Sequence, residues 1–456
     1  MNREIEDPMV YSACVEWFQD WVAAAPPTLH DEWDVQRWMD DDMHDATRVF
    51  LAYAFNTPRA RNDAIMILRA LYYEHFLFEQ QRAVAALEPN PRLAATLPHM
   101  RQTPQKSAAW HAESRDVLSG HEFGALVAGG AAARLAALLK KCAPAEAPAA
   151  SQEEAVAAPP AADSQHVFLT PPTGSLSPFK WGWRFEPVAR DLFATVYAGG
   201  VENVYDGLGR IRHPLLPRLG ASPDGLITAG PRVGRLIELK CPITRQLNGS
   251  IPIDYWCQMQ LQAEVCNVDA VEYFEASLGT ALGPPTIGLM AALATPPCAT
   301  MPYIGALAVV APSADAPWTS YTYVYSPLVS ACPEGATTVT TWTPDLPEGA
   351  VVLETAYWWV KDAFHKTVMR NPRWWDTVGC PIYEAFWDEV DAARADGRYA
   401  HRYETQLFIV DDDADLEPIV GSSGSRAAIE DGEVEDAEDA EGAECAAGIW
   451  IGVEDS

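Results

Sequence analysis

Residues 220–262 read GASPDGLITAGPRVGRLIELKCPITRQLNGSIPIDYWCQMQLQ, and this stretch decides the expected fold. Two short apolar, β-prone runs flank a segment of turn residues around Pro231. Apolar runs that are separated by Gly and Pro predict a β-hairpin. Since Pro231 lies midway between Asp224 and Glu238, a turn there makes these carboxylates cross-strand neighbours. The opposed Cβ atoms of such a pair are roughly 4.5–5.5 Å apart.

The predicted hairpin combines Asp224 and Glu238 with Lys240, two residues further along the second strand. Two carboxylates at this separation can hold one divalent cation against a phosphate group. Residues two apart on a strand project from the same face, so the Lys240 ammonium points towards the water that attacks the phosphate. An E-x-K triplet alone is more often a solvated charge pair, but the segments on either side favour a catalytic site.

After the hairpin, the spacing of polar residues predicts a helix over residues 254–265, with Tyr255, Gln258 and Gln262 along one stripe. If this stripe faces the hairpin, Gln258 can donate to a phosphate or a metal-bound water and accept from Lys240. The alternative is a glutamine on the helix surface.

Before the hairpin, a second helix is indicated by five apolar residues at helical spacing: Trp181, Phe185, Val188, Leu192 and Val196. Glu186 lies at the edge of this stripe. Its carboxylate is a candidate further metal ligand, either directly or through a water molecule. The alternative is an i,i+4 ion pair with Arg190.

In sequence order, the chain contains WGWRFEPVA, GASPDG, IELKCP and DYWCQMQLQ. This order resembles the phage lambda exonuclease and YqaJ-type viral recombinase nucleases, a branch of the PD-(D/E)XK superfamily that large DNA viruses also encode. The resemblance covers residues 180–278. It implies an α/β fold with a restriction-endonuclease-like core, in which helices flank a mixed central sheet. The implied activity is magnesium-dependent exonucleolysis of double-stranded DNA, 5′ to 3′, in viral recombination, repair or genome processing.

The resemblance also implies roles for individual residues. Glu186, Asp224 and Glu238 match the metal ligands of the family. Lys240 matches the lysine that orients or activates water, and Gln258 matches the first glutamine of the family's tyrosine-containing helix. The implied cofactor is Mg²⁺, with Mn²⁺ as the alternative.

Three further residues are expected to bind the substrate. Ser222 occupies the family's small hydroxyl position before the aspartate, where it would bond a DNA phosphate, and Tyr255 lies in the glutamine helix. The third is Arg184. The pocket for a 5′-phosphate is matched less well, and its candidates are Ser175, Ser177, Lys180 and Arg184. Exonuclease polarity and the end requirement therefore stay open.

Charge is distributed unevenly along the chain. The formal net charge of −31 and the pI of about 4.6 argue against a polyanionic partner. However, residues 411–456 contain 16 acidic residues and one basic residue, whereas residues 180–245 contain ten basic and six acidic ones. The segment that would face DNA is thus locally basic. The arginines expected to meet phosphates, with a solvated surface charge as the alternative for each, are Arg210, Arg212, Arg218, Arg232 and Arg235.

Composition divides the chain into four predicted parts. They are a helical N-terminal region at 1–142, an Ala/Pro/Glu-rich linker at 143–164, a YqaJ-like PD-(D/E)XK nuclease domain with a C-terminal extension at 165–410, and a disordered acidic tail at 411–456. No catalytic constellation is visible in the N-terminal region, which we expect to cover the sheet, bind DNA or dock a partner. The β-rich runs within 280–350 either extend the sheet or form an inserted arm.

Five tryptophans near the end of the nuclease domain are expected to lie in one helical stretch: Trp358, Trp359, Trp374, Trp375 and Trp387. Lys366 lies among them, so the stretch interleaves aromatic and basic side chains. Such a stretch can stack on single-stranded DNA. Tryptophans at helical spacing are more often part of the core, and we favour that interpretation.

Nine cysteines show no CxxC pair and no Cys/His metal spacing. With no signal peptide and no apolar run long enough for a bilayer, we expect a reducing intracellular compartment, the host cytoplasm or nucleus or a virion, and no secretion or membrane insertion. The expected partners are double-stranded DNA, a single-strand annealing or replication protein, and further copies of the chain. The sequence does not specify an interface between copies.

Two other functions fit the same residues. One is a structure-selective endonuclease of the same fold, which would also cut a closed circular duplex. The other is a non-catalytic protein that binds DNA or a recombination partner through the nuclease fold. The presence of Glu186, Asp224, Glu238 and Lys240 together disfavours the second.

Overall fold

The computed structural model describes residues 8–24, 43–105, 107–143, 178–197, 203–281, 283–293, 302–316, 321–397 and 399. Most of the predicted linker and the whole predicted tail lie outside these ranges, as do Ser175 and Ser177. No helix of the described part is long and apolar enough to cross a membrane.

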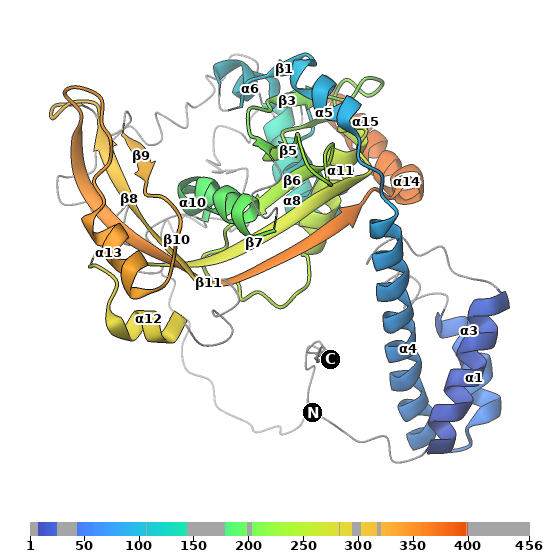
Figure 1. The fold of residues 1–456 in the computed structure, drawn as a ribbon. Coiled ribbons are helices and arrows are strands. Elements are labelled where there is room, and N and C mark those ends of the chain that lie inside the picture. The colour runs from blue at the N-terminus through green and yellow to red at the C-terminus, as the bar shows by residue number, and fades with distance from the viewer. Residues whose placement is uncertain are drawn as a thin grey trace, which may run out of the picture. The chain divides into compact units, whose positions relative to one another are not determined.

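An eight-stranded mixed sheet forms the centre of the fold (Figure 1). Its strand order is β10-β8-β11-β7-β6-β5-β2, and β9 pairs with β8 beside β10. The strands are β2 (Val204–Tyr205), β5 (Gly225–Ile227), β6 (Leu236–Lys240), β7 (Ala270–Ala281), β8 (Tyr303–Ala311), β9 (Thr322–Tyr325), β10 (Val329–Ser330) and β11 (Val351–Met369). Strands β6 and β7 are parallel and the other pairs are antiparallel. A parallel pair needs a crossover connection, and helix α11 (Ile253–Cys266) supplies it.

Strands β5 and β6 form the predicted hairpin. Gly225 pairs with Ile237 and Leu226 with Leu236, so the same register places Asp224 opposite Glu238. The turn depends on Gly234, whose φ is 93° and whose added Cβ would lie 2.6 Å from the Asn90 carbonyl oxygen. Only glycine combines this backbone conformation with so close an approach.

Helices cover both faces of the sheet. Successive side chains of a strand point to opposite faces, so neighbouring residues of β6 pack against different helices. Leu236 packs with helices α7 (Gly120–Ala128), α8 (Gly130–Cys142), α11 and α15 (Cys380–Asp396). The next residue, Ile237, packs with α10 (Pro178–Leu192) on the other face. The fold class is therefore the predicted one, a mixed sheet flanked by helices.

The remaining elements are short or lie near the N-terminus. The helices are α1 (Pro8–Ala24), α3 (Met43–Ala54), α4 (Pro58–Ala85), α5 (Pro91–Thr96), α6 (Ala108–Glu113), α12 (Ile287–Leu293), α13 (Pro333–Thr341) and α14 (Pro372–Trp374). Short π-helical turns at Phe193–Tyr197 and Trp375–Gly379 follow α10 and α14, and a 3₁₀ turn at Leu97–His99 follows α5. Strands β1 (Gln102–Thr103), β3 (Arg210–Arg212) and β4 (Gly220–Ala221) form a second sheet in the order β1-β3-β4.

The N-terminal region is helical, as expected, but its parts pack differently. Helices α1, α3 and α4 share an apolar cluster of their own. Helix α7 packs closely on α11. The helices approach each other so closely at Gly124 that an added Cβ there would lie 2.2 Å from the Asp254 carbonyl oxygen. Strand β1 pairs with β3, which precedes the hairpin in sequence. Residues 102–142 thus pack against the elements that carry the hairpin, although the domain boundaries themselves stay predictions.

The expectation of one helical stretch for the five tryptophans is wrong. Trp358, Trp359 and Lys366 lie in β11, a 19-residue strand between β7 and β8. The two indoles cover glycines of the neighbouring strands, since added Cβ atoms at Gly305 and Gly279 would each lie 2.3 Å from an indole carbon. These partners are distant in sequence. The other part of the expectation holds, because four of the five are buried: Trp358, Trp374, Trp375 and Trp387.

The β-rich runs within 280–350 extend the sheet. Strand β8 pairs with β11 over most of its length, and β9 pairs with β8. Because β8 is nearly all buried, its continuous apolar sequence is typical of a strand covered on both faces.

Candidate active site

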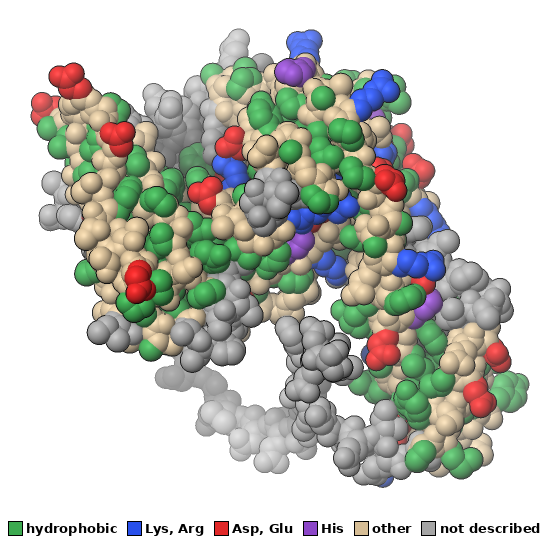
Figure 2. All heavy atoms as spheres, viewed as in Figure 1, with side chains coloured by type: hydrophobic (Ala, Val, Ile, Leu, Met, Phe, Trp, Pro, Cys, Tyr) green, Lys and Arg blue, Asp and Glu red, His purple; other side chains and the backbone are tan. Residues whose placement is uncertain are grey.

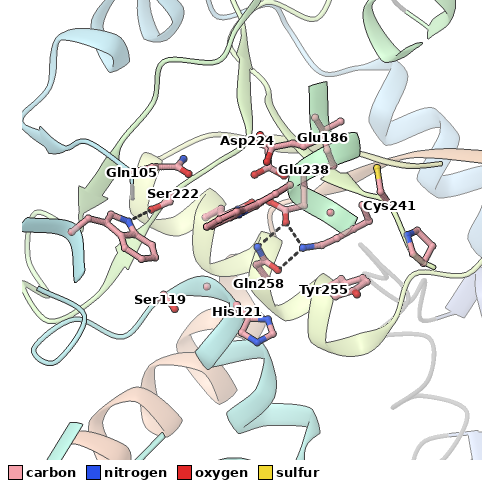
Figure 3. Close-up of a pocket in the computed structure, with 18 of the residues that line it drawn as sticks. Gln105, Ser119, His121, Glu186, Ser222, Asp224, Glu238, Cys241, Tyr255 and Gln258 are labelled. Carbon is pink, nitrogen blue, oxygen red and sulfur yellow. Dashed lines mark hydrogen bonds and ion pairs between the residues drawn. The ribbon is translucent and has the colours of Figure 1, made fainter. Parts of the chain in front are cut away.

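One pocket collects most of the predicted site residues (Figure 3). Its volume is ≈ 160 Å³, far above the ~10–15 Å³ that one water molecule needs, so a hydrated cation fits. The predicted residues that line it are Glu186, Ser222, Asp224, Glu238, Lys240, Tyr255, Gln258 and Gln262.

Asp224 and Glu238 lie side by side at the end of the hairpin (Figure 3). The backbone N–H of Leu239 donates to Asp224 Oδ2 over 2.8 Å, which holds the aspartate against β6. Burial raises the pKa of Asp224 well above its ordinary value, and the neighbouring Glu238 and Glu186 carboxylates raise it further. This cluster of negative charge is the property expected of a cation site.

Three donors hold the Glu238 carboxylate, which is almost completely buried. Gln258 Nε2 donates to its Oε1 over 2.7 Å, and Gln262 Nε2 donates to its Oε2 over 2.6 Å. Lys240 Nζ forms an ion pair with Oε1 at 2.8 Å. The polar stripe of α11 therefore faces the hairpin as predicted, and Gln262, which was named only for its spacing, contacts the carboxylate as closely as Gln258 does.

Lys240 contacts Glu238, Gln258 and Tyr255 in the pocket. Besides the Glu238 ion pair, its Nζ donates to Gln258 Oε1 over 3.4 Å and lies 4.6 Å from the centre of the Tyr255 ring. A cation over an aromatic face is attracted by the ring quadrupole. Gln258 thus accepts from Lys240 as expected, while Tyr255 restricts where the ammonium group can lie.

The structure shows the ion pair that was the alternative for Glu186. The residue lines the pocket, yet its Oε1 forms the i,i+4 ion pair with Arg190 at 2.7 Å, and Arg190 also contacts Asp206 at 2.8 Å. Within the described ranges, no three His, Cys, Asp or Glu side chains are arranged around one point that could hold a metal ion. Asp224 and Glu238 therefore offer at most two neighbouring carboxylates to a cation, and the role of Glu186 as a further metal ligand stays a prediction.

Ser222 faces the pocket with its hydroxyl oriented by Trp110. The Trp110 indole Nε1 lies 3.3 Å from Ser222 Oγ (Figure 3). An indole N–H can only donate, so the serine oxygen accepts and its own proton is directed elsewhere. Buried Arg210 fixes the indole, because its guanidinium stacks at 4.2 Å from the ring centre and donates to the Trp110 carbonyl over 2.8 Å.

The second wall of the pocket comes from residues that sequence reasoning missed. They are Gln105, Trp110, His111, Ser119, Gly120 and His121. A local signal was available, because Ser119 and Glu122 form a capping box at the start of α7. The first residues of this helix, at its positive dipole end, line the same pocket as the carboxylates. Close packing keeps them there, since an added Cβ at Gly120 would lie 2.9 Å from Gln258 Cγ.

Arg184 lies apart from the pocket that the other predicted residues line. Its side chain is fully buried, with the guanidinium carbon 5.4 Å from the centre of the Tyr323 ring. Glu186 faces the pocket from α10, and a residue two positions earlier projects from a different side of the helix. The structure therefore does not bring Arg184 together with the other predicted site residues, and its role in substrate binding stays a prediction.

The arginines expected to meet phosphates all have acceptors within the described part of the protein. Arg212 pairs with Glu113, Arg218 with Asp391, and Arg232 and Arg235 with Glu272, whereas Arg210 is buried against Trp110. On the face shown in Figure 2, blue Lys and Arg side chains lie among acidic and apolar ones. The count of charged residues along the sequence thus selected arginines that are buried or form ion pairs. Such a count does not include the acidic partners that lie elsewhere in the sequence and approach these arginines on folding.

The structure thus combines a mixed sheet, a hairpin with an aspartate opposite an E-x-K triplet, and a helix of glutamines, which is the arrangement that the resemblance to PD-(D/E)XK nucleases implies. Residues 109–269 match the model of the YqaJ-like viral recombinase domain. Over these residues the chain is therefore similar to this family, and the match supports a nuclease. The matched range contains the hairpin, α10 and α11, and also the second wall of the pocket from Trp110 onwards.

Two solved structures of the alkaline exonuclease LHK-Exo from Laribacter hongkongensis are similar to this chain. The first has 17% sequence identity and a TM-score of 0.33, and covers 64% of this chain and 96% of its own. The second, a complex with dAMP, has 15% identity and a TM-score of 0.31, and covers 63% of this chain and 95% of its own. No curated protein matches the chain.

Proposed function

We propose that the protein is a metal-dependent deoxyribonuclease that degrades double-stranded DNA from its ends, 5′ to 3′, in recombination, repair or genome processing. The observation that carries this proposal is the pairing of Asp224 with Glu238 on one hairpin, with Lys240 beside them in a pocket of a YqaJ-like domain.

The residues of the pocket fit a divalent cation. Asp224, Glu238 and Glu186 offer only carboxylate oxygens, the ligands that Mg²⁺ prefers, and Mn²⁺ accepts the same donors. Burial and then repulsion from Glu238 and Glu186 raise the pKa of Asp224, and a bound cation relieves such repulsion. Asp224 and Glu238 would hold the ion, with Glu186 as the third contributor.

When bound, the cation would polarise the scissile phosphate and lower the pKa of a coordinated water. The chain's own groups position the reactants. Gln258 and Gln262 hold Glu238 in one orientation. Lys240, restrained by Glu238 and Tyr255, would orient the attacking water. The Ser222 proton is free to bond a phosphate oxygen, because Trp110 occupies the serine oxygen as a donor.

The test compares an end-labelled linear duplex, with and without a 5′-phosphate, and a closed circular duplex, each in Mg²⁺ and in EDTA. Asp224→Asn removes a proposed ligand without changing the shape of the side chain, and Glu348→Gln, an exposed acid outside the pocket, is the matched control. Stepwise loss of the linear duplex by the native and control proteins only, and only in Mg²⁺, is expected. Cutting of the circle would make the protein an endonuclease. Inactivity on both duplexes would favour a DNA-binding protein, and an active Asp224→Asn variant would contradict the site.

A further inference from the structure

Tyr325 is a residue of strand β9 that contacts the helix carrying Glu186. Its hydroxyl donates to the Arg184 carbonyl oxygen on α10 over 2.6 Å, although the two residues are 141 positions apart. Tyr325 and Tyr323 project from the same face of β9, and both rings pack against the apolar cluster of α10. Strand β9 lies outside residues 109–269, so the donor comes from a segment that the family model does not cover.

The hydrogen bond is of ordinary length and its direction is fixed. A distance of 2.6 Å lies in the range of O–H···O hydrogen bonds. Burial raises the pKa of the Tyr325 hydroxyl, the charges of Tyr323 and Glu186 raise it further, and the charge of Arg184 lowers it. The hydroxyl therefore keeps its proton at neutral pH and donates it to the carbonyl. A carbonyl oxygen has two lone pairs, so it can accept this bond in addition to a helical one.

The turn of α10 that carries Glu186 benefits from a bond outside the helix. Pro187, the next residue, lies inside α10 and has no N–H, so it cannot donate to the carbonyl four residues earlier. This removes one of the helix's own hydrogen bonds from the turn over residues 183–187. Tyr325 bonds the carbonyl of Arg184, which lies in the same turn. Strand β9 thus holds the turn where proline removes an internal bond.

The position of this turn decides where the Glu186 carboxylate can lie. Glu186 lines the pocket together with Asp224, and its Oε1 is paired with Arg190 at 2.7 Å. The Glu186 side chain is 30% exposed, and an ion pair in contact with water adds little to stability. The carboxylate can therefore exchange this partner for a stronger one, and the backbone of α10 limits how closely it approaches Asp224.

We propose that Tyr325 is a positioning residue, whose hydroxyl holds the α10 turn so that Glu186 reaches a cation bound at Asp224 and Glu238. The proposal rests on the proposed function, because it assumes that these carboxylates bind the metal ion. It gives the β8–β9 part of the sheet a role in metal affinity, although neither of these two described strands lines the pocket.

The experiment titrates Mn²⁺ into the metal-free protein without DNA. Tyr325→Phe keeps the ring and removes only the hydroxyl. The Kd for Mn²⁺ should rise by about 2- to 12-fold, the range that one hydrogen bond is worth in an equilibrium constant. Tyr323→Phe is the matched control, because it removes a hydroxyl from the same face of β9 and leaves the bond to Arg184 in place. Its Kd should equal that of the native protein.

The Glu186→Gln background separates positioning from a general structural role. Glu186→Gln should itself weaken Mn²⁺ binding, and Tyr325→Phe should add nothing to this loss, because the carboxylate that the hydroxyl positions is gone. A purely structural tyrosine would lower Tm in both backgrounds without changing either Kd. The proposal would be overturned by an unchanged Kd in Tyr325→Phe, by an equal loss in both backgrounds, or by an unchanged Kd in Glu186→Gln.

Hydrogen exchange of the α10 amides provides a second measurement that does not depend on the metal. Exchange over residues 183–192 should be faster in Tyr325→Phe than in the native protein and in Tyr323→Phe, and equal rates would reject the anchor. Failure of the proposed function is distinguishable. A native protein that binds Mn²⁺ but hydrolyses no DNA would refute that function and leave the titration as the test, whereas one that binds no Mn²⁺ would overturn both.

Discussion

Replacing Asp224 with asparagine should make the protein more stable in EDTA, although it removes a residue of the active site. Asp224 is buried beside two other carboxylates, and its pKa lies well above the ordinary value of 3.8. Asparagine has the same shape, carries no charge, and keeps an oxygen that can accept from the Leu239 N–H. The variant thus loses the repulsion while keeping the hydrogen bond.

The size of the effect follows from the hairpin register. For two charges ~5 Å apart, as cross-strand neighbours are, with an effective dielectric constant of ~20, the repulsion is about 3 kcal/mol. Lys240 also lies close to Asp224 and lowers its pKa, so it offsets part of this repulsion. We therefore expect a gain of about 1–2 kcal/mol in the free energy of unfolding. A change of ~1 kcal/mol raises Tm by roughly 2–4 °C in a domain of ~150–250 residues.

The raised pKa of Asp224 also determines how the stability of the folded protein changes with pH. Because the folded pKa of Asp224 is raised, the folded protein holds a proton that the unfolded chain releases above pH 3.8. Stability from this group is complete below pH 3.8 and is lost as the pH rises towards the folded pKa. Asparagine does not titrate, so the advantage of the variant should be larger at pH 8 than at pH 5.

Thermal unfolding at both pH values, in EDTA and in excess Mg²⁺, provides the assay. Mg²⁺ at ~100 times its Kd should stabilise the native protein by about 2.7 kcal/mol and the Asp224→Asn variant by much less, so the order of stability should reverse. Glu348→Gln should follow the native protein throughout. A variant that is less stable in EDTA at both pH values, or that gains as much from Mg²⁺ as the native protein, would refute the reasoning.

Three further changes test other parts of the structure. Burial alone would raise the pKa of Glu272, but bonds from His365 and two arginines lower it to about 2. Glu272→Gln should therefore cost about 3 kcal/mol at neutral pH in urea unfolding, a difference that disappears as the pH falls from 4.5 towards 2. Lys240→Met should lower kcat by roughly 10²-fold or more while calorimetry still detects Mg²⁺ binding. Gln262→Leu removes a donor to the proposed ligand Glu238 and should weaken Mn²⁺ binding by about 10- to 100-fold in a direct titration.

The sequence by itself determined the parts of the site that depend on local order. The β5–β6 hairpin follows from two apolar runs and a short turn, and the turn alone places Asp224 opposite Glu238. Helix α11 follows from the spacing of its apolar and polar residues, which also places Gln258 towards the hairpin. Each of these features spans fewer than about 20 residues, so few alternative arrangements compete with it.

Only the tertiary structure decided which distant segments complete the pocket. Trp110 reaches Ser222 across 112 residues, and no local pattern encodes such a contact. The same holds for β11. Its aromatic sequence is also compatible with a helix, and the strand is specified by packing of its indoles over Gly279 and Gly305 on neighbouring strands. The arginine pairs also formed only on folding, when acidic partners such as Glu272 were brought to them. Short-range order is set by turn and spacing chemistry, whereas long-range contacts depend on which buried surfaces fit together.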